Sequence, residues 1–251
     1  MPPRDLAGLG EGWLHGYERR RASTKEFEMF TPNLSILPEP QRQLWGELRD
    51  TPKTFVLYGG TALALRIGHR QSEDFDFFSN MPFHPNSLRD SVPYLKHAEM
   101  TQFQDNTLTA LVDRNGPVKL SFFGSLGMKR AQDPDIAEEN GVQVASLLDL
   151  LASKLKTIQS RAEAKDYRDI VASFDAGLSL AEGLAAAAAI YGKNFNGALS
   201  LKALTFFEDG DLPRLPPATQ KRLLEAATSV NIRELPSVAA KPGLSRREEG
   251  S

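Results

Sequence analysis

Hydrophobic residues recur with two different periods along the chain, and the change of period near residue 145 divides it in two. Before that point, short apolar or alternating runs lie between glycine, proline and polar clusters, which is typical of strands. The sequence predicts strands at 54–58, 73–78, 100–103, 107–112 and 117–123, and helices at 41–50, 61–68 and about 85–96. The sequence Asp113-Arg114-Asn115-Gly116 before the last strand predicts a hairpin turn.

From Ser146 to about residue 229 the spacing of apolar residues is helical. Helices are predicted at 146–161 and about 164–176, and the pairs Ser146/Asp149 and Ser179/Glu182 have the spacing of capping boxes. The run of five alanines at 185–189 favours a helix with a close packing face. The expected fold class is therefore α+β, with a mixed sheet followed by a helical C-terminal domain.

Four segments are expected from these patterns. Residues 1–40 read as an irregular N-terminal arm, 41–145 as the α+β core and 146–235 as the helical domain. The polar, glycine- and proline-containing end at 236–251 is expected to be disordered.

Composition and charge narrow the class of function. The chain has 251 residues, no cysteine, four histidines, and 30 Lys+Arg against 32 Asp+Glu. Thiol catalysis and cysteine-ligated metals are excluded, so a metal site would be built mainly from carboxylates, which suits Mg²⁺ or Mn²⁺. A net charge of −2 argues against binding nucleic acid by charge alone. No apolar run reaches membrane-spanning length and the start lacks a secretory segment, so we expect a cytoplasmic protein without membrane contact.

Two short motifs in the first half carry candidate chemistry. Gly59-Gly60 ends a predicted strand just before a helix, where backbone N–H groups and the helix dipole form a seat for phosphate, and Thr61 can cap that helix or donate to a phosphate oxygen. Asp74 and Asp76 alternate with Phe75 on a strand, so both carboxylates project to one side and repel each other. A divalent cation would remove that repulsion. Alone, each motif is more often a turn or a solvated surface; together they indicate nucleotidyl transfer.

The stretch from Tyr58-Gly59-Gly60 to Asp74-Phe75-Asp76 resembles the signature of the AbiEii/AbiGii-type nucleotidyltransferase toxins, a branch of the DNA polymerase β-like nucleotidyltransferase superfamily. The resemblance extends to about residue 175. It implies a polymerase β-like core, a nucleoside triphosphate substrate, and Mg²⁺ or Mn²⁺ on Asp74 and Asp76. It also implies action as the toxin of a toxin–antitoxin or phage-defence pair, with an antitoxin partner and RNA or protein as acceptor.

The segment 150–170 resembles the family's downstream motif, and the resemblance implies that Lys154, Arg161 and Asp166 complete the site, with Asp169 in support. Lys154 interrupts an otherwise apolar helical face and needs a partner, which a nucleotide phosphate or the aspartates of the next helix could supply. A structural ion pair between the two helices is the alternative. In the loop before the acidic strand, Arg70 could neutralise phosphate or simply pair with a nearby acid.

One position departs from the superfamily pattern. A third carboxylate usually lies on a neighbouring strand, and the matching position here is Ser121, a poor general base at neutral pH and a weak metal ligand. Two further hypotheses therefore stay open beside a Mg²⁺-dependent transferase. One is a catalytically degenerate module that binds nucleotide or protein, and the other is a transferase that acts on an aminoglycoside-like small molecule.

Overall fold

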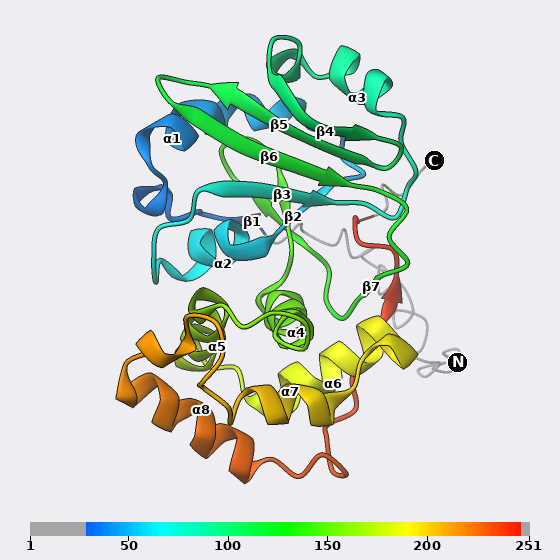
Figure 1. Cartoon of the computed structure of the whole chain (residues 1–251). Coiled ribbons are helices and arrows are strands. Elements are labelled where there is room, and N and C mark those ends of the chain that lie inside the picture. The colour runs from blue at the N-terminus through cyan, green and yellow to red at the C-terminus, as the bar shows by residue number, and fades with distance from the viewer. Residues whose placement is uncertain (1–28, 247–251) are drawn as a thin grey trace, which may run out of the picture.

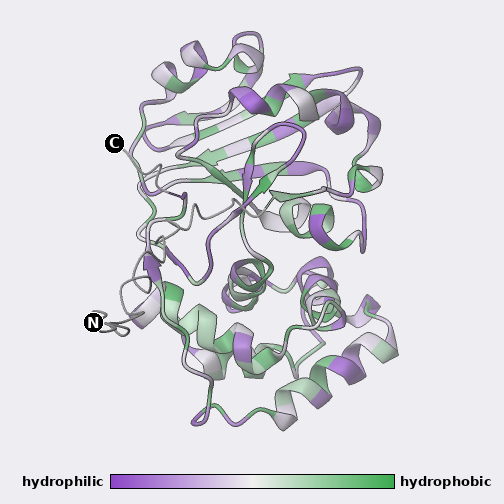
Figure 2. Cartoon of the chain, turned by 180° about the vertical axis from the view of Figure 1, so that it is seen from behind, coloured by the Kyte–Doolittle hydropathy of each residue, from purple (hydrophilic) through white to green (hydrophobic). Residues whose placement is uncertain are grey.

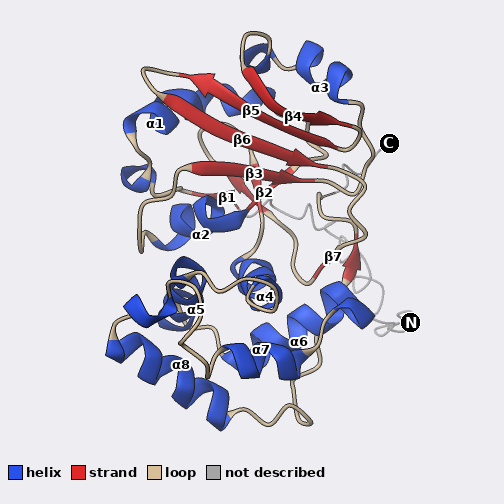
Figure 3. Cartoon of the chain, in the orientation of Figure 1, coloured by secondary structure: helices blue, strands red, loops and turns tan. Residues whose placement is uncertain are grey.

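The computed structural model describes residues 29–246. Strands gather in one half of the molecule and most of the long helices in the other, as Figures 1 and 3 show. This arrangement confirms the expected α+β organisation. Residues 1–28 of the predicted N-terminal arm lie outside the described residues, as do the last five residues of the predicted tail.

A mixed sheet forms the first half, with the strand order β1-β8-β9-β2-β3-β6-β5-β4 in the described residues. Strand β3 is antiparallel to β2 and parallel to β6, so it lies between two segments that are remote from each other in sequence. The strands of this sheet are β1 (Met29–Phe30), β2 (Val56–Tyr58), β3 (Asp74–Phe78), β4 (Glu99–Gln104), β5 (Thr107–Asp113), β6 (Pro117–Phe123), β8 (Asp135–Ala137) and β9 (Gln143–Val144). A separate pair consists of β7 (Lys129–Arg130) and β10 (Lys241–Pro242).

Helices cover the sheet and form the second half (Figure 1). The α-helices are α1 (Glu39–Trp45), α2 (Gly59–Ile67), α3 (Pro85–Ser91), α4 (Leu147–Thr157), α5 (Ala164–Asp175), α6 (Leu180–Tyr191), α7 (Gly197–Ala203) and α8 (Pro217–Ser229). Short 3₁₀ segments are Leu34–Ile36, Gly46–Asp50, Pro93–Leu95, Gly192–Asn194 and Leu212–Arg214. The expected helix at 85–96 is therefore split, because Pro93 has no N–H to continue α3.

Alternation of side chains explains how β3 serves both the core and the site. Phe75 and Phe77 are fully buried, whereas Asp74 and Asp76, which alternate with them, are only partly buried on the opposite face. Figure 2 shows the hydrophobic segments in the middle of the sheet. The expected hairpin joins β5 to β6, and its turn places Asn115 and Gly116 at positive φ, a conformation that these two residues tolerate better than most.

Helix α4 contributes to the hydrophobic cores of both halves. Leu150 belongs to the core under the sheet, while Leu151 and Leu155 belong to the core of the helical half. The helix packs closely against α6 at Gly183, where a Cβ atom would lie 2.7 Å from Leu151. Three alanines of the 185–189 run are buried, in keeping with the close packing face expected there. Because of its double contact, α4 fixes the position of the helical half relative to the sheet.

Some elements differ from the sequence-based expectations. Strands β1, β8 and β9 have only two or three residues each, too few for alternation to reveal them. The segment expected to be disordered from residue 236 is structured in its described part, because β10 pairs with β7 and Leu244 is buried in the sheet core. In residues 29–246 no single helix is long and apolar enough to span a membrane; α5 and Leu180–Asn194 meet the length and composition criteria only as a pair bent by 115°.

Candidate active site

The strand-to-helix junction after Tyr58 forms one wall of the site. Helix α2 begins at Gly59 without a side-chain cap, so the N–H groups of its first turn have no side-chain acceptor at Tyr58. Gly59 has a φ of +78°, and a Cβ atom there would lie 2.6 Å from a carboxylate oxygen of Asp76. A Cβ at Gly60 would collide with the guanidinium of Arg70. The two glycines therefore leave space for the charged groups beside them as well as for a ligand.

The acidic pair lies on the adjacent strand, β3. Asp74 is about half exposed and has Lys119 Nζ at 3.6 Å from its carboxylate. Burial and the neighbouring charge of Asp74 raise the pKa of Asp76, while Lys119, Lys154 and a hydrogen bond from Ser121 oppose this shift. Ser121 lies directly across from Asp76 in the parallel register of β3 and β6. Ser121 is therefore the residue of β6 that lies beside Asp76.

The opposite wall comes from α4 and α5. Lys154 is nearly buried and its Nζ lies 2.7 Å from carboxylate oxygens of both Asp166 and Asp169, which are fully buried. Arg161 binds Asp166 through two nitrogens at 2.8 and 3.1 Å. Burial favours the neutral form of Asp166, but the hydrogen bond from Arg161 and the charge of Lys154 outweigh it and lower its pKa. These acids remain ionised inside the protein because cations surround them.

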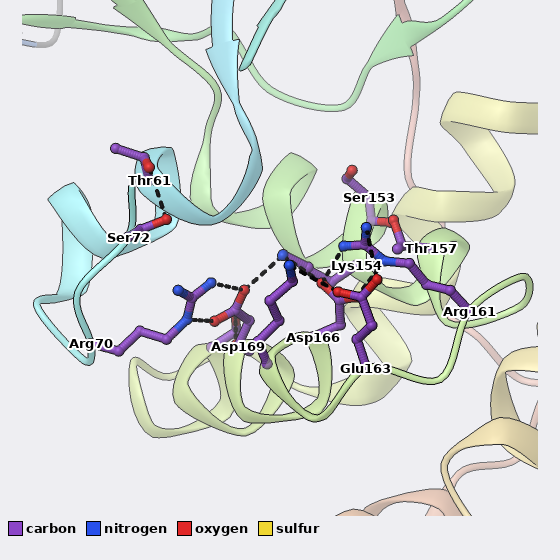
Figure 4. Close-up of polar contacts among 12 residues, drawn as sticks. Thr61, Arg70, Ser72, Ser153, Lys154, Thr157, Arg161, Glu163, Asp166 and Asp169 are labelled. Atoms are coloured by element: carbon purple, nitrogen blue, oxygen red, sulfur yellow. Dashed lines mark hydrogen bonds and ion pairs between the residues drawn. The ribbon is translucent and has the colours of Figure 1, made fainter. Parts of the chain in front are cut away.

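A loop of the sheet half reaches the same buried acids. Arg70 binds Asp169 with both Nε and Nη2, at 2.6 and 2.9 Å, and His69 Nε2 lies 2.7 Å from the same carboxylate. Figure 4 shows Arg70 and Lys154 meeting at Asp169, and Lys154 and Arg161 meeting at Asp166. Despite its burial, Asp169 has a pKa well below its usual range, owing to the hydrogen bonds from His69 and Arg70 and to the charge of Lys154. The network therefore joins the two halves of the molecule beside the site.

These walls enclose a cavity of about 600 Å³. Most of the site residues expected from the sequence line it: Gly59, Gly60, Arg70, Asp74, Asp76, Lys154 and Arg161. Thr61 does not, because its buried hydroxyl contacts Ser72 and donates to the carbonyl of Asp74, tying α2 to β3 instead of facing a ligand. Asp166 is also outside the lining and holds Lys154 and Arg161 from behind.

The cavity also contains residues that the sequence did not single out. Lys119 could have been found, because it shares a strand face with Ser121 and lies in register with Asp74. Lys165 lines the cavity as well, although it pairs with Glu163. Phe78 and Phe123 contribute aromatic surface from β3 and β6, and their alternation with buried phenylalanines is the signal that would have placed them on this face.

The acidic pair suits a hard divalent cation. Asp74 and Asp76 offer carboxylate oxygens, and burial, together with the charge of Asp74, raises the pKa of Asp76 despite the opposing charges of Lys119 and Lys154. Within residues 29–246 no group of three His, Asp or Glu side chains is placed to hold a metal. Two carboxylates leave several positions of Mg²⁺ for water and substrate oxygens, which is the common arrangement for a metal that acts on phosphates. The donor set therefore fits Mg²⁺ or Mn²⁺ bound together with a substrate.

The fold has counterparts among solved structures. The chain superposes on MenT4, a nucleotidyltransferase toxin from Mycobacterium tuberculosis H37Rv, with a TM-score of 0.52 and 16% identity over 77% of this chain and 83% of that one. A nucleotidyltransferase-like protein from Paracoccidioides brasiliensis gives a TM-score of 0.43 and 18% identity, over 68% and 84% of the two chains. The first likeness confirms a nucleotidyltransferase fold.

Comparison of the sequence with other proteins identifies the family as well as the fold. An uncharacterised protein of Aquifex aeolicus (strain VF5) is 33% identical over 118 residues, 46% of this chain, and the chain spans 55% of the length of that relative. The profile described as "Nucleotidyl transferase AbiEii toxin, Type IV TA system" matches residues 44–235, well over half of the chain, and so covers both walls of the cavity. The resemblance noted in the sequence is confirmed: this chain belongs to the AbiEii family of nucleotidyltransferase toxins.

Proposed function

We propose that the cavity binds a nucleoside triphosphate together with a divalent cation and transfers the nucleotide to an acceptor hydroxyl. One observation carries this proposal: Asp74 and Asp76 line the same cavity as Lys154 and Arg161, which lie on the facing wall. The pKa of Asp76 is raised, so the nearby lysines do not fully stabilise its charge. Such a pair of walls can bind a metal on one side and phosphate oxygens on the other.

The charges of the site support a requirement for the cation. Five cationic and three acidic side chains line the cavity, and the two buried aspartates of α5 bring the acidic side chains to five. The chain by itself therefore offers no surplus of positive charge to a triphosphate. When bound to Asp74 and Asp76, Mg²⁺ would supply that charge and polarise the reacting phosphate.

The residues of the chain have separate roles in the proposed reaction. The α2 N-terminus at Gly59 and Gly60 and the guanidinium of Arg70 bind the phosphates, and Lys154 and Arg161 neutralise the pyrophosphate as it leaves. The acceptor oxygen forms a bond to the α-phosphorus while the bond to the bridging oxygen breaks. Pyrophosphate departs with that electron pair, and the acceptor proton passes to water. Asp166 acts as a positioning residue, because it touches Lys154 and Arg161 but not the cavity.

We further propose that this activity makes the protein the toxin of a toxin–antitoxin pair, with an antitoxin partner and RNA or protein as acceptor. Membership in a family described as type IV toxins supports this role. The near-balance of charge around the cavity argues that shape and specific contacts, more than bulk charge, select the acceptor.

A transfer assay tests the proposal directly. The purified chain is incubated with each of the four NTPs labelled at the α-phosphate, Mg²⁺ and a bacterial cell extract. We expect label to move from one or more NTPs to a macromolecule. Asp74→Asn/Asp76→Asn should reduce transfer by about three orders of magnitude, because charge stabilisation by a metal is worth several kcal/mol. Asp90→Asn/Asp105→Asn, which changes two exposed aspartates, is the matched control and should retain transfer.

A binding module without catalysis is the second candidate, because the sequence pattern matches Ser121 to the position of a third acid and Ser121 lies in register with Asp76. Calorimetry with NTP, with and without Mg²⁺, separates the two candidates. Binding that ignores Mg²⁺, without any transfer, would favour the module, whereas Mg²⁺-dependent binding with transfer lost in the Asp74/Asp76 variant supports the enzyme.

A further inference from the structure

The cavity has an aromatic end that the proposed reaction does not yet use. Phe78 follows Asp76 by two residues on β3, and Phe123 follows Ser121 by two residues on β6. The parallel register places Phe78 and Phe123 directly beside each other. Both are partly exposed and line the cavity, whereas their neighbours Phe77 and Phe122 are fully buried on the other face of the sheet.

These two rings are held in a fixed arrangement. Phe78 stacks on the ring of Tyr58, with centroids 5.0 Å apart and planes within 10° of parallel. Phe123 meets Phe78 edge to face, at 5.6 Å and 86°. Tyr58 is almost fully buried and packs against one face of the Phe78 ring. The cluster thus presents a preorganised aromatic surface to the cavity and loses little side-chain freedom when a ligand binds.

The two ends of the cavity along β3 differ in their chemistry. The loop with Arg70 and Ser72 precedes the strand, and Gly60 lies against these two side chains, so cationic and backbone N–H groups gather at the Asp74 end. Phe78 lies at the opposite end. A step of two residues along a strand covers roughly 6.6 Å, so Phe78 follows the acidic pair at about the span of one sugar.

We infer that Phe78 and Phe123 form the binding surface for the nucleobase of the nucleoside triphosphate. The inference rests on the proposed function, in which the phosphates lie toward Gly60 and Arg70 and the α-phosphorus lies at the acidic pair. The base is joined to that phosphorus through one ribose and is the aromatic group that every such substrate carries. Stacking on an aromatic side chain suits all four bases, since each has a π face.

The experiment measures binding without transfer. α,β-Methylene analogues of the four NTPs, whose bridging carbon blocks transfer, and inorganic tripolyphosphate, which has no base, are titrated into the chain by calorimetry with Mg²⁺. Stacking is worth roughly 1–3 kcal/mol per base, so Phe123→Leu should weaken binding of the analogues by about 5- to 100-fold. Its affinity for tripolyphosphate should not change.

Three variants complete the experiment. Phe123→Tyr keeps an aromatic ring and should restore the affinity for the analogues to nearly that of the original chain. Phe78→Leu should weaken binding in the same selective way, but it also removes the contact with Tyr58, so Phe123 carries the main test. Phe103→Leu, at an exposed position on β4, is the matched control and should change neither affinity.

The results separate this inference from the proposed function. Equal losses of affinity for the analogues and tripolyphosphate in Phe123→Leu, or no loss for either, would overturn the inference. Unchanged analogue binding combined with weaker transfer to the acceptor would also overturn it and assign the rings to the acceptor instead. If the original chain binds neither the analogues nor tripolyphosphate, the proposed function fails first, and the inference fails with it.

Discussion

The site contains two pairs of aspartates whose surroundings shift the pKa in opposite directions. Asp74 and Asp76 lie on a strand and face a cavity, and Lys119 Nζ lies 3.6 Å from the carboxylate of Asp74. Burial and the charge of Asp74 raise the pKa of Asp76. Asp166 and Asp169 lie on a helix, are fully buried and are surrounded by cations that lower their pKa values. Ionised acids need cations in both places, but only the acids of α5 have several cations in direct contact.

This difference distinguishes a binding site from a structural connection. Asp166 and Asp169 on α5 have all their cationic partners within the chain. Their charges therefore stabilise the fold and hold Lys154, Arg161 and Arg70 in position. The pair on β3 is left incomplete at a cost in folding free energy, which binding of a cation would recover.

The largest expected effect concerns Asp169. Asp169→Asn leaves Lys154 and Arg70 without one of their charged partners in a buried place, so the free energy of unfolding should fall by about 3–5 kcal/mol. Urea denaturation measures this change. Asp175→Asn removes an acid from the same helix that pairs with Arg222 at the exposed surface, and its cost should stay below about 1 kcal/mol. Equal costs for both variants would contradict the structural role of the buried pair.

The next effect concerns the space that the acidic strand requires. Gly59→Ala places a Cβ atom at positive φ and against Asp76, so it should cost about 2 kcal/mol in stability and also displace the carboxylate. Gly177→Ala is the matched control, because Gly177 also has positive φ but nothing within 4 Å of the added atom. Mg²⁺ titration by calorimetry in the presence of tripolyphosphate should show weaker binding for Gly59→Ala alone. Weakening by both variants would mean that backbone strain, not contact with Asp76, is responsible.

The smallest expected effect is an increase, not a decrease, in the free energy of unfolding. Without Mg²⁺ and at neutral pH, Asp76→Asn should modestly raise the free energy of unfolding, because the raised pKa of Asp76 means that folding disfavours its charge. This gain should disappear as the pH falls through the raised pKa toward 3.8, the ordinary pKa of an aspartate, since the folded state then takes up the proton itself.

The loss of stability caused by Asp169→Asn should depend on pH in a different range. Because the pKa of Asp169 is lowered in the folded state, its stabilising effect is complete above pH 3.8 and is lost only as the pH falls below that value. Denaturation curves between neutral and acidic pH measure both differences. Parallel pH profiles for the two variants would remove the distinction drawn between the two pairs.

Local patterns in the sequence were sufficient for the elements that carry the site. Alternation placed Asp74 and Asp76 on one face of β3, and the glycine pair marked the start of α2, because both signals lie within a few residues. The superfamily pattern pointed to Ser121 on a neighbouring strand, and the register with Asp76 comes from the structure. The positions of Lys154 and Asp166 were expected, and the ion pair between them was one of the two interpretations considered.

Contacts between remote segments could not be predicted in the same way. Arg70 binds Asp169 across 99 positions of sequence, and nothing local to either residue indicates the other. The hydroxyl of Thr61 could equally have faced a phosphate, and only the packing of the loop before β3 directs it to Ser72 and Asp74. The tail at 241–244 was assigned to disorder from its composition, although its pairing with β7 and the burial of Leu244 depend on distant residues.

The ion pair between Arg70 and Asp169 limits which sequence changes the two halves of the chain can accept independently. A replacement of the helical half by another helical bundle would have to bring an acid to the place of Asp169, or the guanidinium beside Gly60 would lose its anchor. The two halves therefore do not behave as interchangeable modules during evolution. Loop 69–70 and helix α5 are thus coupled by charge, whereas α8 joins the helical half through the buried side chains of Leu223 and Ala227.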